Sequence, residues 1–240
     1  MRFLLYNIRY GTGGTPGRGP FQFFRHTGER LGEIVEFIRT VQPDVAGLVE
    51  VDAGSYRSRR VNQAEAIAGA LGHYHAFRSK YGAASLAHRI PVMRKQGNAF
   101  VVRDSAKDVR FHYFTKGVKR LAIELELKEV VFFLVHLALG GRTRFRQLHD
   151  LYELVKKTRK PVIVAGDFNT IWGEHEIRLF RAACGLATAD PGNRPSFPSW
   201  RPKRHLDFIL HSPGVVIDRF DMPAVGLSDH LPLICDFHIP

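Results

Sequence analysis

The sequence has few cysteines and no long apolar run. Only Cys184 and Cys235 occur among 240 residues, which is too few for a disulfide scaffold and not the spacing of a zinc knuckle. No apolar segment approaches the roughly 20 residues needed to cross a bilayer. The first residues also lack the basic leader and apolar stretch of a secretory signal. These absences predict a cytoplasmic protein without a transmembrane segment.

Acidic residues are also scarce. The chain has 35 Lys and Arg against 23 Asp and Glu, a formal net charge of +12, so its average surface potential attracts polyanions such as nucleic acid or an acidic membrane. The alternative is a source organism that simply prefers arginine, and charge alone does not name a substrate. The 45% hydrophobic and 11% aromatic content is typical of a globular protein. We predict a single domain over residues 1–240.

Apolar runs and their periodicity predict an α/β fold. We expect helices over residues 31–41, 62–71 and 145–155, the first from apolar residues at i, i+3, i+4 and i+7 and the second from the Asn62 and Glu65 capping box. Strands are expected at residues 2–8, 44–49, 74–78, 98–103, 109–114, 121–127, 130–134, 161–165, 205–210 and 231–237. Because several strand pairs lack an intervening helix, two packed mixed β-sheets flanked by helices fit better than a parallel doubly wound sheet.

A glycine-rich segment, residues 11–19, follows the first strand. It lacks the Gly-Lys-Ser/Thr ending of a phosphate-binding P-loop. It is therefore predicted to be a loop without a nucleotide-binding role.

Oxygen ligands stand at the ends of predicted strands. Asn7 ends the first strand, Glu50 ends the strand after the first helix, and Asn169 follows a buried strand. Mg²⁺ and Mn²⁺ prefer oxygen ligands, and a phosphoryl-transfer site needs only one or two carboxylates with neutral oxygens. For Glu50 alone, a solvated strand terminus is the competing interpretation.

The string Gly166-Asp167-Phe168-Asn169 leaves a buried strand through a glycine. Asp167 can hold a water or accept its proton, and Asn169 can donate to a phosphoryl oxygen without adding negative charge. The alternative is an Asx turn that caps the next helix.

Asp207 and His230 are the histidine and carboxylate pair that we expect to act together. Asp207 lies among apolar strand residues and needs a partner, and His230 follows Asp229 directly before another strand. A carboxylate on one ring nitrogen fixes the tautomer and leaves the other nitrogen for proton transfer or phosphate contact. The alternative is that Asp207 caps a loop and His230 is one of 12 ordinary histidines.

Further groups could contact phosphate. His136 closes a predicted strand, where an imidazole could protonate a leaving oxygen, although a satisfied strand-end histidine is an equally simple explanation. Arg120 and Arg142 could neutralise phosphate on one rim. The arginines near Arg142 also fit the solvated face of a helix.

Seven strings taken in order resemble the endonuclease/exonuclease/phosphatase superfamily over nearly the whole chain. They are Tyr6-Asn7-Ile8, Gln42 to Val51, Gln96-Gly97-Asn98-Ala99, His136-Leu137, Gly166 to Asn169, Leu206-Asp207-Phe208-Ile209 and Ser228 to Pro232. The resemblance implies a four-layer α/β sandwich like pancreatic DNase and a magnesium-dependent hydrolase.

The resemblance also implies a role for each matched residue. Asn7 and Glu50 belong at the metal with Asp229 at its edge, Asp167 and Asn169 at the attacking water and the scissile phosphate, His136 and His230 at the phosphate, Asp207 behind His230, and Asn98 at the substrate.

Two departures from the family pattern restrict the comparison. Val49 stands where the family commonly has glutamine, so an outer-shell amide is absent. Tyr6 stands where abasic-site endonucleases usually carry tryptophan, and their lesion-reading insertions are not recognisable, which argues against a repair endonuclease.

Three functional hypotheses follow. The first is a Mg²⁺-dependent phosphodiesterase, Mn²⁺ being possible, that acts as a nuclease on DNA or RNA. Its predicted backbone contacts are Arg57, Arg59, Arg60, Arg94, Lys95 and the basic stretch at 201–204. The second keeps the chemistry but takes a phospholipid or small metabolite, with Phe197, Trp200 and residues 21–24 as an apolar rim. The third is a catalytically silent nucleic-acid-binding scaffold. The sequence does not predict the oligomeric state.

Overall fold

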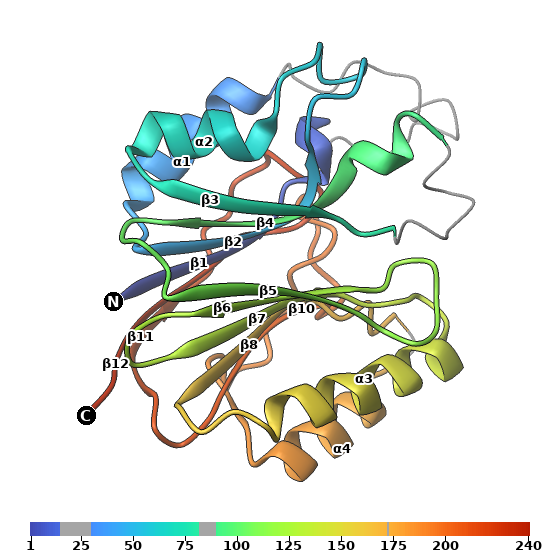
Figure 1. Ribbon diagram of the computed structural model, residues 1–240, viewed down its shortest axis with the longest axis vertical. Coiled ribbons are helices and arrows are strands. Elements are labelled where there is room, and N and C mark those ends of the chain that lie inside the picture. The colour runs from blue at the N-terminus through green and yellow to red at the C-terminus, as the bar shows by residue number, and fades with distance from the viewer. Residues whose placement is uncertain (15–29, 82–89, 172) are drawn as a thin grey trace.

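Two six-stranded sheets pack face to face in the computed structural model, which describes residues 1–14, 30–81, 90–171 and 173–240 (Figure 1). The first sheet has the strand order β11-β12-β1-β2-β4-β3, and the second has the order β5-β6-β7-β8-β10-β9. The strands are β1 (Arg2–Asn7), β2 (Val45–Asp52), β3 (Tyr74–Ser79), β4 (Gln96–Val102), β5 (Asp108–Tyr113), β6 (Leu121–Glu126), β7 (Val131–His136), β8 (Val162–Asp167), β9 (Ala187–Thr188), β10 (Asp207–His211), β11 (Val216–Asp221) and β12 (Leu233–His238).

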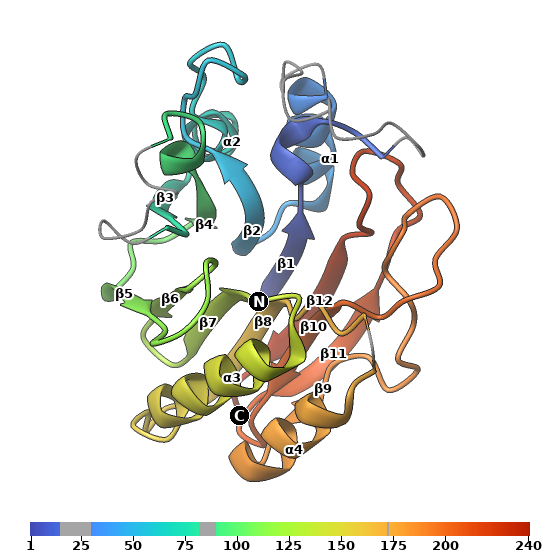
Figure 2. The same cartoon turned by 90° about the vertical axis from the view of Figure 1, so that its right-hand side faces the viewer.

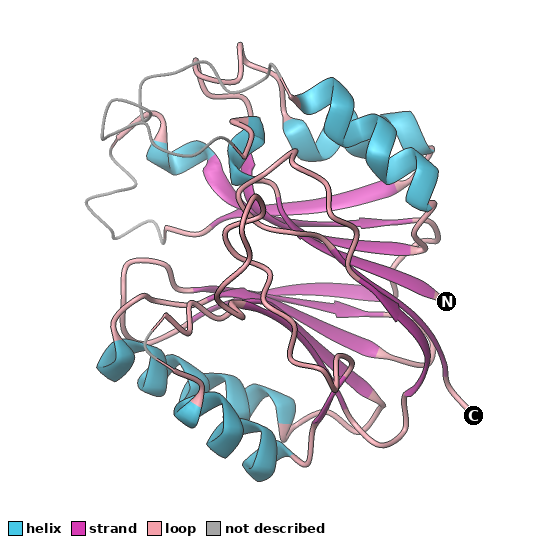
Figure 3. Cartoon of the chain, turned by 180° about the vertical axis from the view of Figure 1, so that it is seen from behind, coloured by secondary structure: helices cyan, strands magenta, loops and turns pink. Residues whose placement is uncertain are grey.

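Four α-helices in the described part of the chain cover the outer faces of the sheets. They are α1 (Leu31–Val41), α2 (Gln63–Leu71), α3 (Gly141–Val155) and α4 (His175–Cys184). Figure 3 shows the two sheets in contact with each other and the helices only on the outside, with α1 and α2 on the first sheet and α3 and α4 on the second (Figure 1). The expected four-layer α/β sandwich is therefore confirmed.

The local signals in the sequence account for most element boundaries. The side chain of Asn62 caps α2 by accepting from the Glu65 amide, and Gly72 ends that helix in the left-handed conformation at φ 68°. Three of these helices and strands had no counterpart in the predictions, namely α4 and the strands β9 and β11. Cys235 is buried as a small apolar side chain, whereas Cys184 is half-buried.

Three apolar clusters hold the layers together. The central one lies between the sheets and includes Phe3, Phe132 and Phe237, and the ring centroids of Phe3 and Phe132 lie 5.1 Å apart. A second cluster packs the second sheet against α3 and α4, and a third packs the first sheet against α1 and α2. β7 and β8 are buried along their whole length. They read as continuous apolar runs because a middle strand of such a sandwich is covered on both faces.

Parallel pairs at the middle of each sheet place several strand ends at one edge of the molecule. β1 pairs with β2 in parallel, and β7 pairs with β8 in parallel. Their C-terminal ends carry the polar residues singled out in the sequence, and Figure 2 shows β1 and β2 above β7 and β8. The fold therefore gathers residues from both halves of the chain. In the described residues no helix is long and apolar enough to cross a membrane.

Candidate active site

Backbone pairing in the second sheet sets three of the expected residues side by side. His136 ends β7 opposite Asp167, the last residue of β8, and Asp167 in turn lies opposite Asp207, the first residue of β10. All three side chains are buried. The nearest nitrogen of the His136 ring lies 3.5 Å from Asp167 Oδ2. The sheet register thus builds a compact group of one imidazole and two carboxylates.

Asn7 connects this group to the first sheet. Its Nδ2 donates to Asp167 Oδ2 at 3.1 Å, and its Oδ1 accepts from the Arg9 amide at 3.1 Å. The hydroxyl of Ser228 donates to the Asn7 carbonyl at 2.6 Å. Asn7 is 2% exposed, so it ties β1, β8 and the loop before β12 together in the interior.

Glu50 is placed by an irregularity in β2. The pairing of β2 with β4 shifts register between Leu48 and Val51, and Glu50 adopts the left-handed conformation at φ 57°. Such a bulge redirects a side chain that a regular strand would point elsewhere. The Glu50 carboxylate lies 3.9 Å from His136 Nδ1 and is 18% exposed. The solvated strand terminus considered above therefore does not describe Glu50.

Electrostatics keep Glu50 ionised. Burial alone would raise the pKa of this carboxyl, but Lys80, Lys119, His230 and Arg9 together lower it below its ordinary value. A negative charge held at low pKa inside a protein is well suited to binding a cation.

Asn98 lies on β4 opposite the bulge that carries Glu50. It is 0% exposed, and neither its Oδ1 nor its Nδ2 has a hydrogen-bond partner among the described residues. Because leaving both ends of a buried amide unpaired is costly, this side chain is poised for a polar ligand.

Asp167 is presented by an unusual exit from β8. Gly166 has φ 150°, and a Cβ there would lie 1.9 Å from the Val135 carbonyl oxygen, so only glycine fits. Asp167 Oδ1 accepts from the Asn169 amide at 2.9 Å, while Asn169 Nδ2 donates to the Leu137 carbonyl at 2.8 Å. The first of these contacts is the Asx turn that we considered as an alternative. It caps no helix, because the next helix begins only at His175.

Asp207 and His230 form the expected pair. His230 Nδ1 lies 2.7 Å from Asp207 Oδ2, which also accepts from the Ser196 hydroxyl at 2.5 Å. Burial alone would lower the pKa of His230, but the charge and hydrogen bond of Asp207, with the charges of Asp167 and Asp229, raise it to about 10. His230 is therefore an imidazolium at neutral pH, with its Nε2 3.8 Å from Asp167 Oδ2.

The two remaining acids differ in their surroundings. Burial raises the pKa of Asp167 to about 6, with Asp207 adding to the effect and His230 opposing it. Burial also raises the pKa of Asp229, although His230 and Arg9 oppose it. Arg9 Nε lies 3.2 Å from Asp229 Oδ2, so Asp229 has a cationic partner beside the group.

His136 is kept neutral. Burial and the charges of Lys119, Lys80 and His230 push its pKa well below the ordinary value. Its Nε2 lies 2.5 Å from Lys119 Nζ, and its Nδ1 is buried without a hydrogen-bond partner in the described part of the chain. A neutral ring with a free polar atom is available to a ligand.

Two lysines at this site were not anticipated. Lys119 Nζ lies 3.8 Å from Glu50 Oε1, and Lys80, 2% exposed, donates to the hydroxyl of Tyr10. Burial lowers the pKa of Lys80 to about 8, although Glu50 opposes the shift. The adjacent basic residue Arg120, which the sequence favoured, is half-buried, and its backbone amide donates to the Lys80 carbonyl at 3.3 Å. No local pattern in the sequence marks either lysine.

The arginines of α3 separate into two environments. Arg142, expected at the phosphate, is exposed, and no contact joins it to the buried group. Arg144 is 1% exposed, pairs with Glu176 of α4, and donates to the Asn169 carbonyl at 2.7 Å. Arg144 therefore buttresses the Asp167 to Asn169 turn from behind.

The residues fit a bound divalent cation. Among the described residues, Asp167, Asp207 and His230 form the one group of acidic and histidine side chains close enough to hold a metal, with their ligand atoms within 4.8 Å of one another. Asp207 Oδ1 is buried and unpaired there. Oxygen atoms from Glu50 and Asn7 border the same group, which is the donor set that hard cations prefer.

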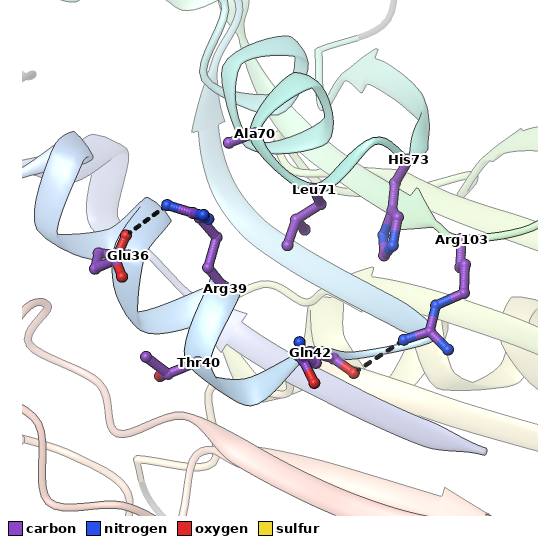
Figure 4. Close-up of a pocket in the computed structure, with 8 residues that line it drawn as sticks. All are labelled: Glu36, Arg39, Thr40, Gln42, Ala70, Leu71, His73 and Arg103. Carbon is purple, nitrogen blue, oxygen red and sulfur yellow. Dashed lines mark hydrogen bonds and ion pairs between the residues drawn. The ribbon is translucent and has the colours of Figure 1, made fainter.

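A separate cavity of about 350 Å³ lies at the opposite end of β2 (Figure 4). Glu36 pairs with Arg39 at 3.0 Å in its wall, and Arg103 contacts both Asp44 and the Gln42 carbonyl. These charges neutralise one another, and none of the site residues lines the cavity. It has no part in the chemistry considered below.

A sequence model of the endonuclease/exonuclease/phosphatase family matches residues 4–230. The chain belongs to this family. A UPF0294 protein of Vibrio cholerae is 32% identical over 125 residues, which is 50% of this chain and 43% of that protein. The chain thus matches less than half the length of this relative.

Solved structures share the fold. The Bacteroides thetaiotaomicron mannosyl-6-phosphatase Bt3783 superposes with a TM-score of 0.73 at 15% identity, covering all of both chains. The human nocturnin catalytic domain with bound sulfate anion gives a TM-score of 0.71 at 22% identity, covering 100% of this chain and 94% of that one. The chain therefore has the fold of this family and carries a buried group of acids and histidine that could hold a metal.

Proposed function

We propose that this protein hydrolyses phosphate esters with a divalent cation, Mg²⁺ in the first place and Mn²⁺ as a substitute. The observation that carries the proposal is the division of roles between two buried neighbours. Asp167, with its pKa raised to about 6, is a better base than an ordinary aspartate. His230, kept cationic by Asp207, is suited to bind phosphate. Paired titratable groups whose pKa values are pushed apart are typical of acid and base chemistry.

Glu50 and Asn7 are the proposed ligands of the cation, with Asp229 at its edge. Two observations support this choice. Glu50 is ionised, and Asn7 can offer its side-chain Oδ1 once that atom gives up its contact with the Arg9 amide. A divalent cation supplies charge stabilisation on phosphoryl and leaving-group oxygens. Asp167, Asp207 and His230 form an alternative metal group, but the short contact between Asp207 and His230 favours proton and phosphate chemistry there.

The protein residues would position water and phosphate. Asp167 orients the attacking water and takes its proton, while Asn169 fixes the Asp167 carboxylate through its backbone amide. Protonated His230 and the unpaired amide of Asn98 donate to non-bridging phosphoryl oxygens. Charge-assisted donors aimed at such oxygens stabilise the transition state more than the ground state.

Nucleic acid is the first proposed substrate class. The loops beside the strand ends that carry the site expose Arg59, Arg60, Arg94 and Lys95, and residues 201, 203 and 204 are exposed and basic. Such side chains contact a phosphate backbone without reading sequence. Arg57, grouped with them in the sequence, is instead 3% exposed with its guanidinium 5.9 Å from the Tyr10 ring centre.

A second candidate keeps the chemistry and takes a small phosphorylated metabolite or a phospholipid. Two observations favour it. The similar Bacteroides protein is named for a phosphatase activity on a sugar, and Phe197 packs on His230 with ring centres 4.9 Å apart while Trp200 is 45% exposed nearby in the chain. Residues 21–24, the other part of the expected apolar rim, lie outside the described residues.

The test is a substrate panel with Mg²⁺, Mn²⁺ and a chelator. It contains supercoiled plasmid, single-stranded RNA, phosphorylated oligonucleotides, sugar phosphates and a phospholipid. We expect turnover in at least one class, abolished by the chelator and by Asp167→Ala. Salt-sensitive nucleic-acid binding without turnover in any metal would contradict the proposal and support the silent scaffold.

A further inference from the structure

The loop between β5 and β6 is fastened to α3 by a buried glutamine. Gln147, 0% exposed, donates from Nε2 to the carbonyls of Lys119 at 2.6 Å and Lys116 at 3.0 Å. Its Oε1 accepts from the Ala138 amide at 2.8 Å, just beyond the end of β7. One side chain therefore fixes the backbone of Lys119 relative to the strand that carries His136.

A second contact holds the other side of the same loop. Asp150 Oδ2 accepts from the amide of Thr115 at 2.7 Å and from its hydroxyl at 2.9 Å. Gly117 has φ 104°, and a Cβ there would lie 2.6 Å from Gln147 Nε2. The loop is thus built to one conformation, and this conformation directs the Lys119 side chain into the site.

Lys80 reaches the same place from the first sheet. The backbone link between Arg120 and the Lys80 carbonyl joins the two segments. Lys80 is 2% exposed. Its ammonium donates to the Tyr10 hydroxyl and lies 5.1 Å from the centre of the Tyr10 ring. Lys80 and Lys119 both act electrostatically on Glu50. Lys119 Nζ lies 3.8 Å from Glu50 Oε1, so ammonium groups from the segment after β3 and from the loop before β6 both act on one carboxylate.

This charge arrangement is unbalanced once Glu50 binds a cation. The carboxylate then offsets one of the two charges of the metal, and its charge is no longer available to the two ammonium groups, which favours the binding of an anion beside them. A phosphodiester group brings one negative charge, whereas a terminal phosphate brings close to two at neutral pH, with three oxygens that accept hydrogen bonds. Lysines act on phosphate as point charges, so a pair of them suits the terminal group.

We propose that Lys80 and Lys119 form a binding site for the terminal oxygens of a phosphate monoester, and that the enzyme therefore removes terminal phosphates in preference to cutting internal diesters. This inference rests on the proposed phosphoesterase function. In the reaction a water oxygen bonds to phosphorus and the ester P–O bond breaks. Asp167 takes one proton from the attacking water and the leaving oxygen takes one from solvent water, which yields an alcohol and inorganic phosphate, and Asp167 then returns its proton to solvent.

The experiment compares two chromogenic substrates at pH 7.5 with Mg²⁺. They are p-nitrophenyl phosphate and bis(p-nitrophenyl) phosphate, followed by a 5′-phosphorylated and a 3′-phosphorylated oligonucleotide. The variants are Lys119→Met and Lys80→Met, which keep the apolar stem and remove the charge. Lys116→Met is the matched control, because Lys116 lies on the same loop and is exposed.

We expect the wild type to prefer the monoester. Each lysine variant should lose about 10- to 100-fold in kcat/KM on the monoester, the effect of one charge-assisted contact, and less than about 3-fold on the diester. Lys116→Met should match the wild type. Calorimetric titration with inorganic phosphate in the presence of Mg²⁺ should show weaker binding in both lysine variants, whereas Mn²⁺ binding is kept.

Other outcomes separate the two proposals. Wild type that cleaves the diester and oligonucleotide backbones but releases no terminal phosphate would overturn the lysine inference and leave the phosphoesterase function standing. Equal losses on both substrates would also overturn it. Wild type without turnover on any substrate would instead overturn the phosphoesterase function. The substrate preference of the wild type is measured directly. The lysine inference can therefore be refuted even if a lysine variant fails to fold.

Discussion

Replacing Asp207 by asparagine should unbalance the buried pair at the centre of the site. Asp207 Oδ2 contacts His230 Nδ1 at 2.7 Å and accepts from Ser196 at 2.5 Å, and the side chains of Asp207 and His230 are 2% and 7% exposed. Asparagine keeps the size and one hydrogen-bond acceptor. It removes the charge that holds the proton on His230.

The magnitude follows from the pKa of His230. In the folded protein that pKa is about 10, against an ordinary value of 6.5. Protonation therefore contributes stability that is fully present below pH 6.5 and is lost as pH rises toward 10. Each pH unit in this interval changes the free energy of unfolding by about 1.4 kcal/mol. The protonation of His230 can therefore contribute at most on the order of 5 kcal/mol to that free energy. Relaxation around a buried pair reduces it, and we expect about 2 to 3 kcal/mol.

The assay is urea unfolding of the metal-free protein at pH 6.5 and pH 9.5. Asp207→Asn should reduce the free energy of unfolding by about 2 to 3 kcal/mol at pH 6.5 and by much less at pH 9.5. Asp218→Asn is the control, since Asp218 pairs with His238 at 2.9 Å on the surface and should cost less than about 1 kcal/mol. Equal losses for Asp207→Asn at both pH values would refute the reasoning.

Three further predictions concern activity and the frame of the site. The rate of the wild type should rise as pH increases through about 6, because Asp167 must be ionised to accept a proton. Asp167→Asn should lower kcat by at least about 100-fold. A flat wild-type pH profile between 5 and 7 would argue against this role of Asp167. Arg144→Met should destabilise the fold by roughly 3 to 5 kcal/mol in thermal unfolding, whereas the exposed Arg142→Met should stay within about 0.5 kcal/mol. Gly166→Ala should cost more than about 2 kcal/mol, since its Cβ would overlap the Val135 carbonyl; an unchanged midpoint in urea would contradict that geometry.

Strong local patterns made most of the fold predictable. The apolar runs of β7 and β8 and the Asn62 capping box lie in contiguous sequence, where periodicity and caps act. α4 carries few apolar positions, its buried residues being Ile177 and Phe180. β11 is an edge strand with no buried residue. Neither produces a long apolar signal, because each packs on only one side.

The acids and histidines could be singled out because they lie at or near strand ends and match family strings. The cations were not. Arg142 and Arg144 are two positions apart on α3, and only the packing against α4 decides that Arg144 is the buried one. Lys119 and Lys80 meet through the fastening of a loop to Gln147, a contact between distant segments that no spacing in the sequence encodes.

The most direct test of the account is phosphate-ester hydrolysis by purified protein with and without a divalent cation, using wild type and Glu50→Gln. We predict turnover that requires Mg²⁺ or Mn²⁺ and stops on chelation. Glu50→Gln should need a much higher metal concentration, because Glu50 is the proposed ionised oxygen ligand. Turnover that persists in the chelator, or a Glu50→Gln protein with unchanged metal dependence, would contradict it.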